Sequence, residues 1–375
     1  MPPPSSGAPA AGAAQETPAE KAPTPATPTL VDIYSRTGAG DLSPAVKDAL
    51  PRVYVPNHSS NSVTVIDSQT LKVVDTFKVG LGPQHVVPSW DLKTLWVTNN
   101  ASHTRRGSLT PIDPTTGKPG PAIPVSDPYN MYFMPDGSSA IVVDEAREQL
   151  DLRDPHTLAL KSSIRTPHCH GINHADFAAD DSYAIFTCEF GGGGLVKIDL
   201  KTLTVVGYLH FSKRSAPQDI RLSADGKVFY VADMMNDGVY LIDGNSFKEV
   251  GFVKTGVGAH GLNVSRDGKK LYVSNRGTHR MPGGPHGPGS ISVIDFATRA
   301  VVATWPIPGG GSPDMGNVSA DGTKLWLSGR FDNEVYAIDT ATGGVTKIRV
   351  GAEPHGLTVW PQPGRYSQGH TGDMR

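Results

Sequence analysis

A short motif, an apolar residue followed by Ile-Asp, recurs along the chain from residue 53 onward. A degenerate copy, Leu152-Arg153-Asp154, fills the one gap in the series. The seven copies lie about 41 to 52 residues apart, and the complete ones are Ile66-Asp67, Ile112-Asp113, Ile198-Asp199, Ile242-Asp243, Ile294-Asp295 and Ile338-Asp339. A repeat of this period restricts the chain to a solenoid, a propeller or a similar array of units.

Each repeat has the pattern of four short strands. In the sixth repeat these strands fall at residues 262–265, 270–274, 290–295 and 301–307. The apolar residues alternate with a period of two, which excludes helical repeats of similar length. Asp-Gly pairs, which favour hairpin turns, separate the first two strands at residues 136, 225, 267 and 321. Seven four-stranded units predict an all-β fold, a seven-bladed β-propeller.

The two ends of the repeat region predict how the ring closes. The first unit starts at its second strand, residues 53–56, and an unpaired first strand follows the last unit at residues 356–360. Pairing these segments completes the first blade and removes open sheet edges. We therefore expect one propeller domain over residues 53–361 and a C-terminal tail over residues 362–375.

The segment before the repeats has a different composition. Residues 1–29 contain eight Pro and eight Ala and, apart from Met1, no large apolar residue, which predicts a disordered tether. Residues 30–52 form a lead-in with a short helix, because Ser43 suits an N-cap and Pro44 a first helical position. Such a tether before a compact domain favours an exported protein (periplasmic, cell-surface or extracellular) whose signal or lipid-anchored leader preceded residue 1. A native cytoplasmic start is the alternative.

Charge and length of apolar runs exclude several classes of partner. The formal net charge is -2 and charged residues make up 19% of the chain, so we expect neither nucleic acid nor an anionic membrane as partner. No apolar run reaches 18 residues, so no membrane span is expected. Two cysteines are too few for a disulfide scaffold or a thiolate zinc site.

Several repeats share a four-residue pattern at the end of their second strand. Tyr54-Val55-Pro56-Asn57, Trp96-Val97-Thr98-Asn99, Tyr230-Val231-Ala232-Asp233 and Tyr272-Val273-Ser274-Asn275 resemble a Tyr-Val-Thr-Asn signature. With the Pro-His-Gly and Asp-Gly turns, this resembles the YVTN family of seven-bladed propellers over about 310 residues. The resemblance implies a bacterial exported protein, with actinobacterial members of unassigned role the most similar. It implies no single activity, since related propellers include lactonases, lyases and copper enzymes.

Polar residues precede the first strand of every blade, and first strands line a propeller channel. They are Gln84-His85, Tyr129-Asn130, Asn173-His174, Gln218-Asp219, His260, Asp314 and His355. We expect His85, His174, His260 and His355 to hold a divalent metal, with copper, zinc and calcium all open. His174, Asp219 and Asp314 are the candidates for catalytic ligand or base. A one-residue shift in strand register would turn these side chains away, and a solvated polar channel is the alternative.

The loops between second and third strands open on the same face as these strand starts. Residues there, together with Asn130, are the candidates for substrate binding: Arg105, Arg106, Asn130, Arg276, His279 and Arg330. Arginines can clamp a carboxylate or phosphate through their fork of donors. Acidic neighbours make ordinary ion pairs the alternative. The insertion at residues 276–289, rich in Gly and Pro, suits a lid over the channel or a loop without a role.

The fourth repeat holds the densest group of metal-ligating residue types. Residues 167–176 include three histidines, Cys169 and an aspartate, and Cys188 ends the next strand on the same face. Three readings stay open: a disulfide between Cys169 and Cys188, two free thiols, or a thiolate-histidine site for copper or zinc.

Two functions from different classes follow from these residues. The first is a metal-dependent enzyme acting on a small polar or carbohydrate-like substrate at the channel mouth, of lyase, hydrolase or lactonase, or copper-oxidase type. The second is a non-catalytic scaffold of the cell envelope that binds a ligand or partner at the same rim. We expect a monomer in either case.

Overall fold

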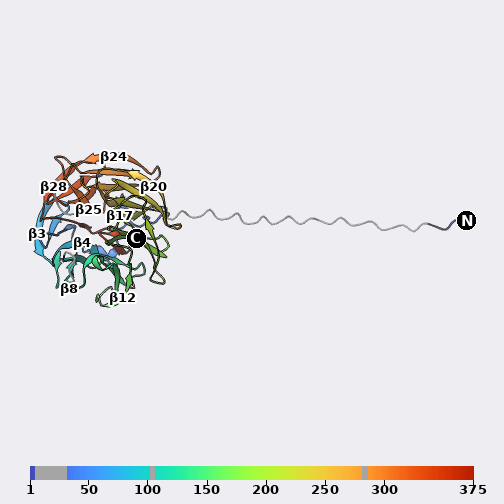
Figure 1. The fold of residues 1–375 in the computed structure, drawn as a ribbon, viewed down its shortest axis with the longest axis horizontal. Coiled ribbons are helices and arrows are strands. Elements are labelled where there is room, and N and C mark those ends of the chain that lie inside the picture. The colour runs from blue at the N-terminus through green and yellow to red at the C-terminus, as the bar shows by residue number, and fades with distance from the viewer. Residues whose placement is uncertain (5–31, 102–105, 281–285) are drawn as a thin grey trace. The chain divides into compact units, whose positions relative to one another are not determined.

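The computed structural model describes residues 1–4, 32–101, 106–280 and 286–375. The chain divides into two units, residues 1–30 and residues 31–375, and the second carries the fold. Its strands form seven antiparallel sheets, the blades of a propeller, which confirms the predicted fold class. In Figure 1 the first strands β4, β17 and β25 lie inside the ring, and outer strands such as β3, β12, β20 and β28 lie on its perimeter.

The blades are numbered here in chain order, and each is given from its inner to its outer strand. Blade 1 holds β29 (Thr358–Trp360), β1 (Arg52–Asn57), β2 (Ser62–Asp67) and β3 (Lys72–Lys78). Blade 2 holds β4 (Pro83–Pro88), β5 (Leu95–Asn99), β6 (Ser108–Asp113) and two short outer strands, β7 (Lys118–Pro119) and β8 (Ile123–Pro124). Blade 3 holds β9 (Pro128–Phe133), β10 (Ala140–Asp144), β11 (Gln149–Arg153) and β12 (Leu160–Arg165).

The remaining four blades follow the same plan. Blade 4 holds β13 (Ile172–Phe177), β14 (Tyr183–Cys188), β15 (Gly194–Asp199) and β16 (Thr204–His210). Blade 5 holds β17 (Pro217–Leu222), β18 (Val228–Asp233), β19 (Gly238–Asp243) and β20 (Lys248–Lys254). Blade 6 holds β21 (Ala259–Val264), β22 (Lys270–Asn275), β23 (Ser290–Asp295) and β24 (Ala300–Pro306). Blade 7 holds β25 (Pro313–Val318), β26 (Lys324–Gly329), β27 (Glu334–Asp339) and β28 (Val345–Arg349).

The ring closes as the sequence predicts. Strand β29 pairs antiparallel with β1, with Val53 opposite Val359 and Tyr54 opposite Thr358. Blade 2 departs from the plan because its outer segment, residues 118–124, contains Pro119, Pro121 and Pro124, which cannot donate to the sheet ladder. The lead-in contains the expected short helix as a 3-10 turn, η1 (Pro44–Val46), whose Ser43 side chain accepts from the Ala45 N–H at 3.2 Å. A second 3-10 turn, η2 (Glu145–Arg147), follows β10.

The hydrophobic core lies between neighbouring blades. Tyr132 and Leu152 of blade 3 pack in one buried cluster with Phe177 and Phe186 of blade 4. Burying apolar side chains from both faces of each sheet holds adjacent blades together at roughly 25 cal/mol per Å² of apolar surface removed from water. The channel is left for polar side chains and for one more element.

Residues 362–375 are that element, which we call the C-terminal hairpin. Strand β30 (Ser367–Gly369) pairs with β31 (Asp373–Met374) and, through Gly369, with Tyr132 of β9. The turn between the strands has positive φ at Gly369 and Gly372 (113° and 121°), where a side chain would be strained. The C-terminus lies inside the ring (Figure 1), so these residues fill the channel and are not a peripheral tail.

Candidate functional site

The first strands of the blades begin with an irregularity that brings two consecutive side chains into the channel. The pairing of β4 with β5 shifts register between Pro83 and His85, and that of β13 with β14 shifts between Ile172 and Ala175. Blades 5, 6 and 7 show the same shift. A β-bulge of this kind re-aims side chains at a strand end. The sequence does not decide which residue of each pair, such as Gln84-His85 or Asn173-His174, faces the channel. In the structure both residues of these pairs are buried.

A hydroxyl group from the second strand holds this bulge. The His85 N–H donates to Thr98 Oγ1 at 3.0 Å, and the His174 N–H donates to Thr187 Oγ1 at 3.1 Å. In blade 6 the N–H of Gly261 donates to Ser274 Oγ at 2.8 Å. Thr98 and Ser274 occupy the third position of the four-residue pattern described above. In blades 2 and 6 that position therefore holds the backbone of the bulged strand.

Four histidine rings meet inside the channel. The ring centroid of His85 lies 5.3 Å from that of His174, 4.8 Å from that of His355 and 5.4 Å from that of His370. None of the four is more than 1% exposed. Burial lowers the pKa of each ring well below its ordinary value, so the rings are neutral at pH 7. Neutral imidazole is the form that binds metal ions.

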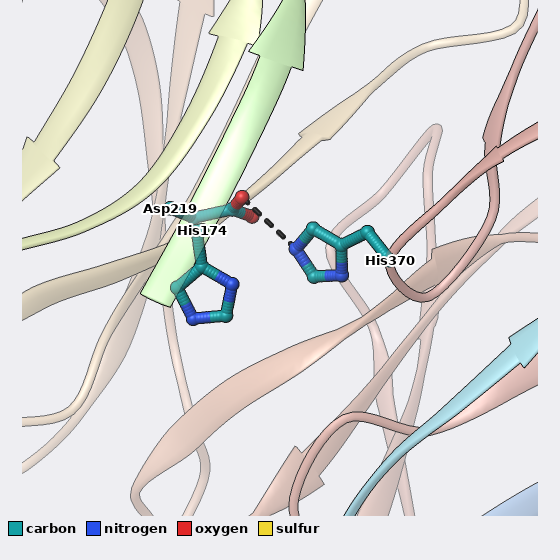
Figure 2. A group of neighbouring side chains, drawn as sticks. All are labelled: His174, Asp219 and His370. Atoms are coloured by element: carbon teal, nitrogen blue, oxygen red, sulfur yellow. Dashed lines mark hydrogen bonds and ion pairs between the residues drawn. The ribbon is translucent and has the colours of Figure 1, made fainter. Parts of the chain in front are cut away.

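Three side chains of this region place one ligand atom each within 4.8 Å of the others: His174, Asp219 and His370. Figure 2 shows them converging from β13, from β17 and from the turn of the C-terminal hairpin. His370 Nε2 lies 3.0 Å from Asp219 Oδ1. Imidazole nitrogens and a carboxylate oxygen are a common ligand set for zinc and copper. This group could therefore hold a metal ion.

The neighbours of these groups determine where protons lie. The Thr371 N–H donates to His370 Nδ1 at 2.5 Å, so neutral His370 carries its proton on Nε2 and donates it to Asp219. The Asn130 amide lies 3.2 Å from His174 Nδ1. His174 Nε2 and both ring nitrogens of His85 have no hydrogen-bond partner among the described residues. Buried polar atoms without partners carry a free-energy cost, which a bound ion would remove.

Asp314 is the centre of a second polar group in the channel. Its carboxylate accepts from the Arg276 guanidinium at 2.9 Å, lies 2.7 Å from His260 Nδ1 and accepts from His355 Nδ1 at 2.8 Å. Burial alone would raise the pKa of Asp314, but Arg276 and the two histidines hold it well below its ordinary value. His355 Nε2 in turn lies 3.3 Å from the Tyr129 hydroxyl. Asp314, His355 and Tyr129 are therefore linked in one series of hydrogen bonds.

The structure separates the four predicted metal ligands into two pairs. His85 and His174 lie in the cluster around His370, with both rings inside the channel. His260 and His355 are held by Asp314, although His355 also contacts His85. Of the predicted catalytic residues, His174 and Asp219 therefore lie together, and Asp314 lies with Arg276.

The predicted substrate-binding residues do not form one group. Arg276 is buried on Asp314, and Asn130 is buried beside His174. Arg330 binds Glu353 Oε1 at 3.2 Å, and His279 Nε2 lies 2.6 Å from Asp237 Oδ1. Of the two remaining predicted substrate-binding residues, Arg106 is exposed and Arg105 lies outside the described residues.

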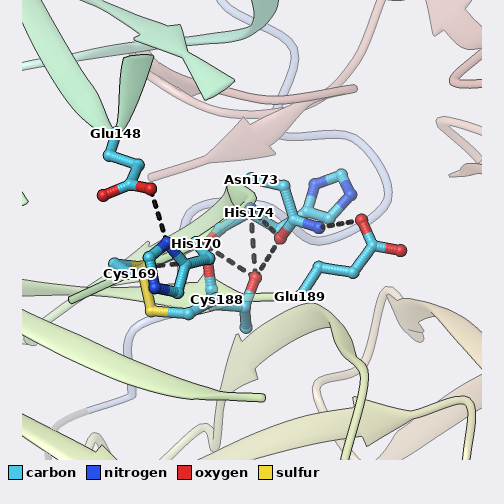
Figure 3. The surroundings of a disulfide bond; sticks show 8 residues. Glu148, Cys169, His170, Asn173, His174, Cys188 and Glu189 are labelled. Atoms are coloured by element: carbon cyan, nitrogen blue, oxygen red, sulfur yellow. Dashed lines mark hydrogen bonds and ion pairs between the residues drawn. A yellow bond between two sulfur atoms is a disulfide. The ribbon is translucent and has the colours of Figure 1, made fainter. Parts of the chain in front are cut away.

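Cys169 and Cys188 form a disulfide, which decides among the three alternatives for this pair. The bond joins the segment before β13 to the end of β14 in the same blade (Figure 3). His170, next to Cys169, is exposed and pairs with Glu148. The cysteines therefore supply no thiolate for a metal site.

Sequence reasoning misses His370. It lies outside the seven repeats, and no copy of it exists at an equivalent position in another blade. The sequence Gly369-His370-Thr371-Gly372 could have indicated this residue, because two glycines three residues apart favour a tight turn with His370 at its tip.

A family model, described as YNCE-like beta-propeller, matches residues 107–363. The chain belongs to the YNCE-like β-propeller family. The match covers five complete blades, the first strand of blade 1 and most of the predicted site, but it stops before His370. No curated protein matches the chain in sequence.

Solved structures similar to this YNCE-like propeller share its fold at low sequence identity. A putative 6-phosphogluconolactonase from Bacteroides uniformis matches with a TM-score of 0.64 and 16% identity, over 83% of this chain and 99% of that one. Hydrazine synthase from Kuenenia stuttgartiensis matches with a TM-score of 0.58 and 20% identity, over 80% and 92%. The dihydro-heme d1 dehydrogenase NirN matches with a TM-score of 0.59 and 15% identity, over 82% and 75%. At these identities the likeness establishes the propeller and no activity.

Among the described residues of the YNCE-like propeller, no helix is long and apolar enough to cross a membrane.

Proposed function

We propose that this propeller binds a transition-metal ion in its channel, with His174, Asp219 and His370 as ligands. The observation that carries the proposal is the convergence of these three side chains, beside a His85 ring whose two nitrogens have no partner. Nitrogen donors favour zinc or copper over calcium, which prefers oxygen ligands. For His370 to bind the metal through Nε2, the proton that this nitrogen now donates to Asp219 must leave it, for example to Nδ1 at the expense of the Thr371 N–H bond.

The metal supports a hydrolytic or lyase reaction on a small polar or carbohydrate-like substrate that reaches the channel from the rim where the bulged strands begin. A bound zinc ion polarises a carbonyl group or lowers the pKa of a coordinated water. The protein's own contribution is to keep buried, neutral histidines in the channel and to hold Asp219 in place through the Leu262 N–H, which donates to it at 2.8 Å. The resemblance to YVTN proteins supports export, and we further propose a monomer with no nucleic-acid partner and no membrane span.

A second function has one observation in its favour. His174, Asp219 and His370 are each no more than 2% exposed, and the ring of Tyr129 contacts that of His174. An ion held there without access for substrate stabilises the ring, and the protein is then a non-catalytic scaffold of the cell envelope.

Metal analysis of protein purified without a histidine tag tests the site. We expect one zinc or copper ion per chain, and an affinity at least ~10-fold lower in His174→Ala and His370→Ala. The matched controls are His156→Ala and His210→Ala, because both residues are exposed and lie away from the channel. A metal-free wild-type protein, or equal affinities in all four variants, would contradict the proposal. Turnover of lactones by the metal-loaded but not the metal-free protein would favour the enzyme over the scaffold.

A further inference from the structure

A cavity of about 290 Å³ opens at the rim of blades 4 and 5, apart from the histidine cluster. It is lined by Glu189, Phe190, Arg214, Met234, Met235 and His279, together with two glycines that follow Phe190. Small-molecule pockets start at ~300 Å³, so the cavity suits a single ring and not an extended chain.

The floor of the cavity contains a buried carboxyl group. Glu189 is 4% exposed and accepts from Gln218 Nε2 at 2.9 Å and from Asn173 Nδ2 at 3.1 Å. A carboxylate has about four acceptor sites, so two of them remain for a ligand. Burial raises the pKa of Glu189 to about 7, against the effect of the Gln218 hydrogen bond, so this group can also be present as the neutral acid.

The wall of the cavity is an exposed aromatic ring held in a fixed position. Phe190 is 47% exposed and lines the cavity, so part of its ring is available to a ligand. Its ring lies against the backbone of Gly171, where an added Cβ would come within 2.3 Å of Phe190 Cδ2. One face of the ring is therefore covered by Gly171.

The disulfide explains why this wall is rigid. Cys169 and Cys188 are bonded, and the N–H groups of Glu189 and Phe190 donate to the carbonyl groups of Gly171 and His170, each at 2.9 Å. These three links hold the segment of Glu189 and Phe190 against the preceding loop, and Figure 3 shows the disulfide beside Glu189. Preorganised groups of this kind lose little entropy when a ligand binds.

The charges of the lining select the kind of ligand. The lining contains one basic group, Arg214, and one carboxyl group, Glu189, and His279 already pairs with Asp237 at 2.6 Å. The cavity therefore has no strong net charge and does not favour an ion. We propose that it binds one monosaccharide ring, with an apolar face of the sugar on Phe190 and its hydroxyl groups on Glu189 and Arg214. A flat apolar face beside hydrogen-bonding groups matches the two sides of a sugar ring.

Methyl NMR of the full chain labelled with [methyl-¹³C]methionine tests this site. Met234 and Met235 line the cavity, whereas Met131 and Met374 are buried away from it. Titration with D-glucose, D-galactose, D-mannose and N-acetyl-D-glucosamine should shift the Met234 and Met235 signals with at least one sugar, at a millimolar Kd. The Met131 and Met374 signals should not move, and Met235→Leu assigns one of the two signals.

Three variants make the test specific. Phe190→Ala should weaken binding by at least ~10-fold, and Glu189→Gln by a smaller but measurable factor, because one stacking face and one acceptor are lost. Phe252→Ala is the matched control, because Phe252 is 39% exposed on β20, outside the cavity. Unchanged thermal melting shows that each variant is folded. No shift with any of the four sugars, or equal affinity in Phe190→Ala and the wild type, overturns the proposal. The cavity contains none of the proposed metal ligands, so adding a chelator should leave sugar binding intact.

Discussion

Replacing Asp314 with Asn should cause a large loss of stability, because it leaves a buried cation without its partner. Asp314 is fully buried and the Arg276 side chain is 2% exposed. The guanidinium makes three hydrogen bonds to the carboxylate, at 2.9, 2.9 and 3.2 Å. Removing one partner of a buried ion pair costs about 3–5 kcal/mol, since the other charge stays buried. We expect the free energy of unfolding to fall by that amount.

Urea unfolding followed by tryptophan fluorescence measures this loss. The matched control is Asp75→Asn, since the Asp75 pair with Lys118 is 33% and 68% exposed and should contribute about 1 kcal/mol or less. The double variant Asp314→Asn with Arg276→Met removes both charges and should recover most of the loss. If Asp314→Asn costs no more than Asp75→Asn, or if the double variant is no more stable than the single one, the ion pair does not have the role described.

Three further changes have expected outcomes. Burial lowers the pKa of His260 from 6.5 to about 4, so the unfolded chain binds a proton before the folded protein does as the pH falls. About 3 kcal/mol of stability that is present above pH 6.5 should therefore be lost by pH 4. In His260→Gln, the free energy of unfolding should fall by that much less over the same pH range. Replacing both Cys169 and Cys188 with Ser should lower the free energy of unfolding by about 3 kcal/mol, because the disulfide closes a loop of 19 residues. The same change should weaken sugar binding. An unchanged urea midpoint under oxidising conditions would refute the stability prediction. Deleting residues 362–375 should abolish metal binding and lower the melting temperature, and a truncated protein that keeps both would show that the hairpin does not complete the site.

The sequence predicts the propeller well, because the same strand pattern occurs in every blade. Seven copies of one strand pattern, together with residues 53–56 and 356–360, are enough to derive the blade number and the ring closure. Strand pairing then follows from local alternation, since consecutive strands in a blade are neighbours in space.

The site is less predictable, because it depends on features outside the repeat. The bulge at His85 is a shift in strand pairing held by the Thr98 hydroxyl, and a pattern of alternating residues cannot reveal it. The sequence identifies Asp314 as a candidate ligand or base, but it does not reveal that Asp314 pairs with Arg276 of another blade. His370 belongs to a segment that no other blade resembles. Long-range pairs of this kind are set by the closed ring and not by neighbouring residues.

The C-terminal hairpin also changes how such an array can unfold. In a repeat protein each unit contacts only its neighbours, so one unit can open while the others stay folded. Here residues 362–375 touch all seven blades, through Thr358, Trp90, Met131, Asp176, Asp219, Arg266 and Asn317. Opening any one blade therefore disturbs a contact on which the other six depend. Without the hairpin, each blade would be coupled only to its two neighbours. With it, hydrogen exchange in the inner strands of all blades should report one shared opening free energy.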